Sequence, residues 1–162
     1  MAAIDLIPFN QVVVVERLSQ APLGAILQVR VPDSAPVVVI RASIATANGV
    51  TNGIVPLEGE DAGVFYSDSE VDDLAALNIT TLVIVALTVP GPARLGINAP
   101  PAGCVCQTPE DTDFALSVRP NRRPDYHAGY VFLSGDKRGV ILRGGTWVVL
   151  GRAIVIPRTT VP

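Results

Sequence analysis

Runs of β-branched residues dominate the hydrophobic pattern of the chain, and clusters of turn-forming residues separate them. The runs at 11–18 and 37–42 are almost continuously apolar, whereas the run at 25–31 alternates apolar and polar positions. β-branched side chains fit a pleated surface, and a continuous run indicates burial on both faces while alternation indicates one exposed face. We therefore predict strands at all three places, arranged in two layers.

Two Asn-Gly dipeptides follow, Asn48-Gly49 and Asn52-Gly53. Such dipeptides favour tight turns, but these two flank only two residues. The spacing predicts one compact loop here rather than two hairpins. The segments at 54–57 and 63–67 predict short strands.

The pattern changes at SDSEVDDLAALN, residues 67–78. Ser67 stands three residues before Glu70, which is the spacing of a capping box, and Val71, Leu74 and Ala75 would share one helical face. The sequence therefore predicts one short helix near residues 69–77.

Strand character returns at 79–89 and dominates the C-terminal part. Between these regions, PGPARLGINAPPAG at 90–103 holds four prolines and three glycines and predicts a long loop or extended arm. The runs YVFLS, GVILR, TWVVLG and AIVIP predict an up-and-down meander over 130–156.

Composition supports an all-β fold in one domain. The 162 residues are 49% hydrophobic but only 17% charged and 5% aromatic, and this length suits a single hydrophobic core. We predict an all-β protein of about eight to ten strands, either a jelly-roll-like β-sandwich or a barrel-like fold, with the sandwich favoured. The prediction is a single β domain over 1–162 with extended N- and C-terminal arms and no internal repeat.

Charge and hydropathy narrow the function classes. A net charge of −3 and a pI near 5.0 count against a dedicated nucleic-acid binder. The longest apolar stretch, at 79–89, is too short for a membrane span, and the first residues lack the basic region of a secretory signal. Low charge with a mean hydropathy of +0.43 favours an oligomer or assembly subunit, although a well-filled β core could give the same composition.

Two cysteines and one histidine are the main candidates for chemistry. Cys104 and Cys106 would share one face of a strand, but a closed zinc site needs four ligands and a disulfide between them has unfavourable geometry. His127, with Asp125 nearby, lacks a nucleophile and any catalytic motif. We therefore predict packed thiols, no catalytic, metal-binding or cofactor-binding residues, and no enzymatic activity.

Acidic runs at 58–61, 68–73 and 109–113 invite a calcium interpretation, since calcium takes hard oxygen ligands. None contains the glycine-bearing loop of an EF-hand. We predict capping and solvated turns at these places.

The segment RPNRRPDYH, residues 119–127, is the candidate binding site. Arginine and tyrosine are enriched at protein interfaces, and prolines would hold the guanidinium groups in a semi-rigid, exposed loop. Two alternatives remain open: pairing with the domain's own acidic loops, and binding of nucleic acid or another polyanion. The predicted partner contacts are Arg119, Arg122, Arg123, Tyr126 and His127.

The proline-rich segment 90–103, the RPNRRP loop and the valine-rich C-terminal run give the chain an overall character that resembles the decoration (cement) proteins of tailed-bacteriophage capsids. This resemblance implies a non-enzymatic subunit that forms dimers or trimers and binds a major capsid protein. It implies the capsid surface of the virion as the location, after synthesis in the host cytoplasm, with no cofactor and no small-molecule substrate. Other virion components, such as a head-completion or tail protein, fit the same character.

Two other function classes stay open. A sandwich face or loop rim could bind carbohydrate or peptide, but the only tryptophan, Trp147, lies in a predicted strand rather than on a sugar-binding surface. A small enzyme would need an acid, base or nucleophile constellation that the sequence does not display.

Overall fold

The computed structural model describes the backbone in nine segments of the chain. In five of these segments it also describes the surroundings of the side chains. The nine segments are 4–10, 17–29, 35–71, 76–78, 81–87, 102–107, 113–121, 129–143 and 148–158. Side chains are described for 17–29, 35–71, 102–107, 113–121 and 129–143.

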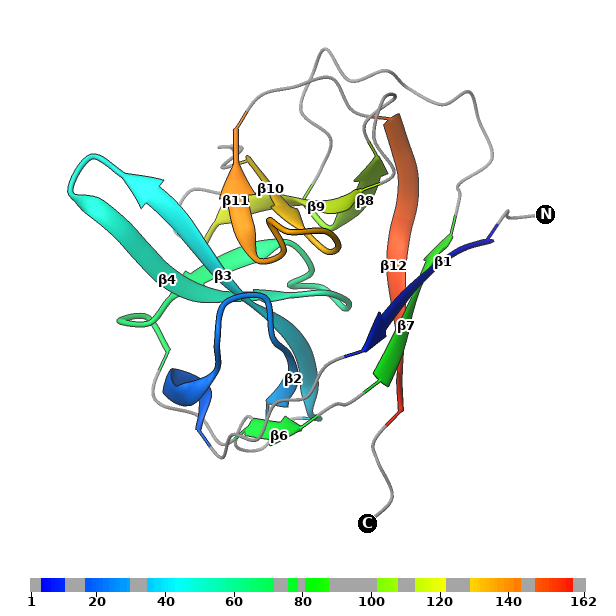
Figure 1. Ribbon diagram of the computed structural model, residues 1–162, viewed down its shortest axis with the longest axis horizontal. Helices are drawn as coiled ribbons and strands as arrows, with labels where there is room; N and C mark the ends of the chain where they lie inside the picture. Colours follow the sequence, from blue (N-terminus) through cyan, green and yellow to red (C-terminus); the bar gives the residue numbers. More distant parts are fainter. Residues whose placement is uncertain are drawn as a thin grey trace.

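The described residues form twelve strands and one short 3-10 helix (Figure 1). The elements are β1 (Ile4–Asn10), η1 (Leu18–Gln20), β2 (Ile26–Val29), β3 (Val37–Thr46), β4 (Gly49–Pro56), β5 (Val64–Ser67), β6 (Ala76–Asn78), β7 (Thr81–Leu87), β8 (Cys104–Gln107), β9 (Phe114–Pro120), β10 (Gly129–Phe132), β11 (Val140–Leu142) and β12 (Val148–Arg158).

Six strands close into a barrel in the order β3, β4, β5, β9, β10, β11 and back to β3. Four of these contacts are antiparallel, whereas β5 with β9 and β11 with β3 are parallel. The prediction of an all-β fold, either sandwich or barrel-like, is confirmed, and the structure has the closed barrel rather than the favoured sandwich.

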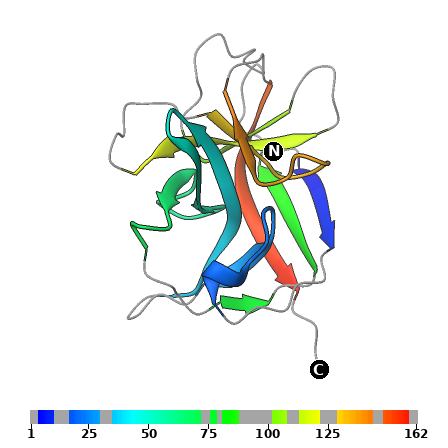
Figure 2. The same ribbon diagram turned by 60° about the vertical axis from the view of Figure 1, so that its left-hand side comes forward.

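The same sheet extends from the barrel along β9. β8 pairs with the first half of β9, β12 pairs with β8, and β7 lies between β12 and β1. Figures 1 and 2 show β1, β7 and β12 running side by side next to the barrel. On the other side of the ring, β2 and β6 continue the sheet from β3.

The barrel is built from two equivalent halves. A shift of 76 residues converts the pair Ile40↔Val55 into Leu116↔Val131, and Ser43↔Val140 into Arg119↔Val64. β3, β4 and β5 therefore correspond to β9, β10 and β11.

The same repeat is present in the sequence as G-x-V-x-L-x-G-x-x-x-G-V at 53–64 and 129–140. Its two inner glycines have positive φ in both copies, 86° and 81° at Gly59 and Gly63, 79° and 88° at Gly135 and Gly139. The prediction of no internal repeat is wrong. The repeat is hard to see because it preserves core positions and glycine conformations while the other positions differ.

The main core fills the barrel and contains aliphatic side chains from both halves, among them Ile40, Val55, Leu116 and Val131. A second cluster lies on the outer side of β3, where Leu18 of η1 and Leu27 of β2 pack with Val39 of β3. β3 is therefore buried on both faces over its first half, as its continuous apolar run predicts.

The predicted helix at 69–77 is wrong where the structure describes it. Glu70 N–H donates to the Ser67 carbonyl at 2.9 Å and closes a turn, while Ala76–Asn78 forms β6, and residues 72–75 lie outside the described part. The expected capping contact is present, since Ser67 N–H donates to Glu70 Oε2 at 2.9 Å. Pairing of β6 with β2 overrides the helical pattern that follows.

The predicted meander is correct only for β10 and β11, which pair antiparallel. The two segments expected as the last strands belong to one strand, β12, which pairs with β8 and β7 instead of β11. Gly151 indicated a turn, but it lies at a register shift inside β12. The strand count exceeds the predicted eight to ten because several strands, such as β6 and β11, have only 3 residues.

The two Asn-Gly dipeptides do not form one loop. Ala47 and Asn48 make a two-residue connection between Thr46 and Gly49, whereas Asn52 and Gly53 lie inside β4. Residues 11–16 of the strand predicted at 11–18 lie outside the described part. At the end of that segment, Leu18 begins the 3-10 helix η1 instead of continuing a strand.

Candidate interaction surface

An apolar row crosses the outer face of three neighbouring strands. Ile141 points into the barrel core, so Val140 and Leu142 on either side of it point outward. Ala45 pairs with Val50, which places both side chains on one face of the β3–β4 sheet. Because Ile141 lies beside Ile44, whose side chain packs against the core, this face continues the outward face of β11.

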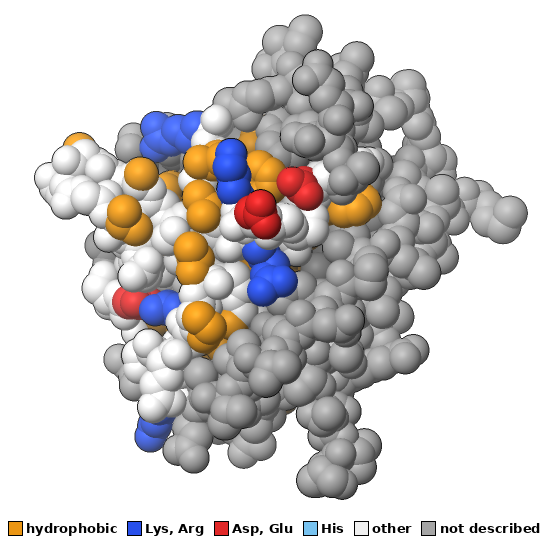
Figure 3. All heavy atoms as spheres, viewed as in Figure 1, with side chains coloured by type: hydrophobic (Ala, Val, Ile, Leu, Met, Phe, Trp, Pro, Cys, Tyr) orange, Lys and Arg blue, Asp and Glu red, His pale blue; other side chains and the backbone are white. Residues whose placement is uncertain are grey.

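The large apolar side chains of this region are exposed. Val50 is 70% exposed and Leu142 38%, and Leu23, in the turn before β2, is 48% exposed. That turn lies against the start of β11, since a Cβ on Gly139 would come within 2.5 Å of Gly24 N. Figure 3 shows hydrophobic side chains gathered on this side of the molecule among a few charged ones. We call this surface the apolar outer face: Leu23, Ala45, Val50, Val140 and Leu142.

The end of the β3–β4 hairpin projects beyond the barrel (Figure 1). Residues 45–50 are all exposed, and the whole stretch 42–57 contains no charged residue. Exposed strand ends in soluble proteins are usually protected by charge, so an uncharged one indicates a contact surface. Sequence reasoning missed this surface, although the charge-free stretch around Asn48-Gly49 was a visible signal.

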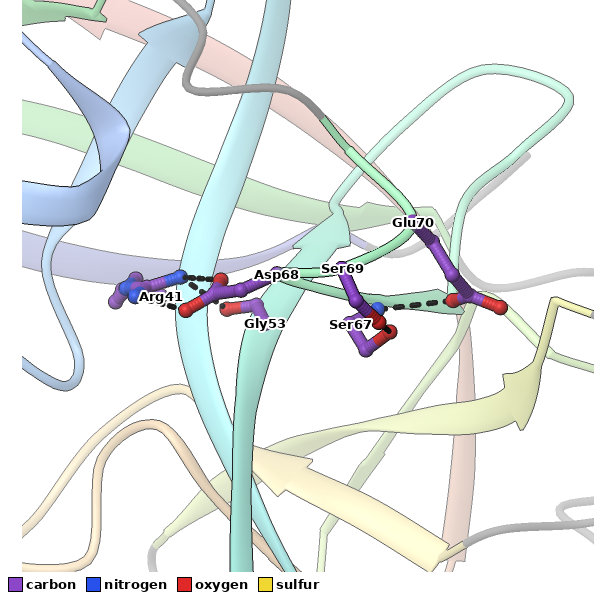
Figure 4. A network of polar contacts seen from close by, with 6 residues as sticks. All are labelled: Arg41, Gly53, Ser67, Asp68, Ser69 and Glu70. Atoms are coloured by element: carbon purple, nitrogen blue, oxygen red, sulfur yellow. Dashed lines mark hydrogen bonds and ion pairs between the residues drawn. The ribbon is translucent and has the colours of Figure 1, made fainter.

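An ion pair between the buried Arg41 and the exposed Asp68 fixes the base of the hairpin (Figure 4). Arg41 is only 6% exposed, and its two terminal nitrogens donate to the Asp68 carboxylate at 2.5 and 2.8 Å. Arg41 Nη1 also lies 3.3 Å from the Gly53 carbonyl, so one guanidinium joins β3, β4 and the turn after β5. This bidentate contact positions the hairpin, and the equivalent place in the second half holds the buried Ser117.

Of the predicted contact residues, the structure describes only Arg119. Arg119 is half-buried and stands one residue before the end of β9, and its Nη1 donates to the Pro120 carbonyl at 3.3 Å. Its backbone N–H donates to the Gly63 carbonyl at 2.9 Å. Arg122, Arg123, Tyr126 and His127 lie outside the described residues.

Arg119 acts electrostatically on Tyr66 of β5. Burial and then the charge and hydrogen bond of Asp61 raise the pKa of Tyr66; Glu70 also raises it, whereas Arg119 lowers it. Arg119 therefore lies close enough to Tyr66 for its charge to act on that phenol.

The segment that follows Arg119 has a counterpart, by sequence position, in the first half of the repeat. Residues 121–128 join β9 to β10, and the 76-residue shift relates them to residues 45–52 of the hairpin end. By sequence position Arg122 and Arg123 correspond to Thr46 and Ala47, but only Ala47 and Asn48 separate β3 from β4, and residues 122–128 lie outside the described part. The two halves of the barrel carry chemically different connections at corresponding positions.

Cys104 and Cys106 are free thiols on β8. Cys106 is fully buried against Ala115 and Tyr130, with Cys104 packed at the edge of the same cluster. Burial, with a smaller contribution from Cys104, raises the pKa of Cys106 to about 12, so this thiol stays protonated and unreactive at neutral pH. The prediction of packed thiols is confirmed.

The described segments contain neither a candidate metal site nor a membrane-spanning helix. No group of three or more His, Cys, Asp or Glu side chains is placed there to hold a metal ion. No helix in these segments is long and apolar enough to cross a membrane. Comparisons of the chain with protein-family models, curated proteins and solved structures find no match.

Proposed function

We propose that the protein is a non-enzymatic structural subunit of a virion, a decoration protein that binds a capsid lattice through protein–protein contacts. The observation that carries the proposal is the apolar outer face next to a projecting, uncharged hairpin. Exposure of such an apolar row to water is unfavourable, and covering it with a partner lowers the free energy.

The size of this surface favours repeated rather than single contacts. Covering the exposed fractions of Leu23, Val50 and Leu142 would supply on the order of 3 kcal/mol, at about 2 kcal/mol for each fully buried side chain. One such contact binds weakly after the entropy cost of association. A dimer or trimer on a regular lattice makes the same contact several times and gains avidity.

We propose the segment 119–127 as a second contact, and this part of the proposal rests only on its residue types. Its arginines and Tyr126 could pair with carboxylates of a major capsid protein. A subunit with one apolar and one basic contact would suit a junction between two lattice subunits.

Particle binding tests the proposal. Virions from the natural source are purified by density gradient, the protein is sought in the particle fraction, and cross-linking with mass spectrometry identifies its neighbour. A capsid-protein neighbour is expected. Absence from the particles, or a neighbour that belongs to no virion, would contradict the proposal.

Leu142→Asp tests the outer face in the same assay, because a charge there would be buried without a partner. Ala35→Asp is the matched control: Ala35 is exposed and precedes β3, roughly 30 Å along the strand from the hairpin end. Leu142→Asp should lose binding while Ala35→Asp keeps it. Equal binding of the two variants would exclude the apolar outer face as a contact with the particle.

A further inference from the structure

The β3–β4 hairpin holds two Asn-Gly dipeptides in different backbone settings. Asn48 lies in the exposed connection, whereas Asn52 pairs with Ser43, and its carbonyl accepts the Asp68 N–H at 3.0 Å. Both asparagines thus precede a glycine and lie in the same hairpin, but the backbone around Asn52 is held more firmly than the backbone around Asn48.

The following glycines differ in the space around them. Nothing lies within 4 Å of the position that a Cβ on Gly49 would occupy, and φ at Gly49 is 121°. A Cβ on Gly53 would lie 2.1 Å from the Tyr66 carbonyl oxygen and 2.7 Å from the Phe65 ring. A ring that includes the backbone nitrogen of residue 49 has room to form, whereas residue 53 is enclosed.

We propose that Asn48 is a site of spontaneous deamidation and that Asn52 is protected from it. The backbone nitrogen of Gly49 loses its proton and bonds to Cγ of Asn48, while the bond from Cγ to the side-chain nitrogen breaks and ammonia leaves. One water then opens the five-membered imide at either carbonyl and gives aspartate or isoaspartate. The balance is one water consumed and one ammonia released, and asparagine is a known thermolabile residue.

The product changes the electrostatics of the hairpin end. A carboxylate at position 48 would be the first charge in the stretch 42–57, next to the Ala45–Val50 part of the apolar outer face. This consequence rests on the proposed function. Partner binding through this surface should weaken with the age of the protein, because a carboxylate must lose water to enter an apolar contact.

The site is tested on the intact protein, incubated in mildly alkaline buffer and mapped by peptide mass spectrometry. Acid forms should accumulate at position 48 well before position 52. In denaturant the two positions should react at similar rates, because the fold no longer protects Asn52. Equal rates at the two positions in the native protein, or an unchanged Asn48, would overturn the proposal.

The consequence is tested with Asn48→Asp in the particle-binding assay, with Asn48→Gln as the uncharged control. Asn48→Asp should bind about tenfold more weakly than the native protein, and Asn48→Gln should bind like it. Equal binding of both variants would overturn the charge effect. If the native protein itself does not bind particles, the proposed function fails, while the mapping still decides whether Asn48 is the reactive site.

Discussion

At the scale of single residues, Gly63 combines two constraints. Its φ is 81°, in the region that disfavours side chains, and a Cβ there would lie 2.2 Å from Gly103 N and 2.4 Å from the Ser117 carbonyl oxygen. Gly59, four positions earlier, has a φ of 86° but no atom within 4 Å of its Cβ position. The pair separates the cost of backbone strain from the cost of close packing.

Gly59→Ala should lower the free energy of unfolding by about 1 to 2 kcal/mol, the cost of the left-handed backbone. Gly63→Ala adds a clash with backbone atoms and should cost about 3 to 5 kcal/mol. Urea denaturation of the two variants measures the difference. Equal losses would show that the chain relaxes around Gly63 and that the close approach to Gly103 is not required.

At the scale of secondary-structure elements, β8 and β10 each carry a group whose protonation is coupled to folding, Cys106 and Tyr130. Burial raises the pKa of Cys106 from its ordinary value of 9.0 to about 12, and burial followed by the Cys106 charge raises that of Tyr130 from 10.0 to about 12. In each case the unfolded chain loses the proton at a lower pH than the folded one. Stability from these groups is therefore complete below pH 9 and is lost as pH rises to about 12.

Urea denaturation at a series of alkaline pH values should show unfolding free energy falling from about pH 9 upward. Cys106→Val removes the thiol from the cluster and should flatten the first part of the fall, leaving the Tyr130 part that begins near pH 10. Thiol reagents at neutral pH should modify Cys104 before Cys106. An unchanged profile in Cys106→Val would mean that Cys106 does not cause the loss.

Strand positions were largely predictable from the sequence, because burial of β-branched residues is a local pattern. The structure confirms the strands predicted around β2, β3, β5, β7, β10 and β11. The pairing of the strands could not be predicted in the same way, because alternation within a strand does not say which strand lies beside it. The parallel pairs β5 with β9 and β11 with β3 are examples. Two local patterns gave wrong predictions for the same reason: pairing with β8 decided the environment of Gly151, and pairing with β2 decided that of Ala76–Asn78.

The candidate surface was harder to predict than the strands. Val50 and Leu142 are ordinary strand residues in the sequence, and only the register of β3, β4 and β11 places them together on the outside. The segment 119–127 was chosen for residue type, and only Arg119 of the predicted contacts has described surroundings. Its contribution to partner binding stays a prediction.

At the scale of the whole molecule, the proposal requires association with copies of the chain. Native mass spectrometry should find dimers or trimers that persist on dilution, and the triple variant Arg119→Ala, Arg122→Ala, Arg123→Ala should bind particles more weakly. A stable monomer over a wide concentration range would count against assembly. Steep salt dependence with retention of DNA would instead favour the polyanion alternative for the arginines.

The two parallel contacts of the barrel have a consequence for biosynthesis. β5 can pair with β9 only after β9 has been synthesised. Ser43 and Ile44 of β3 can pair only after β11, which ends at Leu142, has been synthesised. At bacterial or eukaryotic rates of synthesis, the first half leaves the ribosome several seconds, on the order of 4 to 15, before the second is complete. During that time its strands have open edges, which are the part of the nascent chain most exposed to chaperones and to mispairing. Closure of the ring is thus one of the last events in making this protein, and a chain stalled before residue 142 cannot complete it.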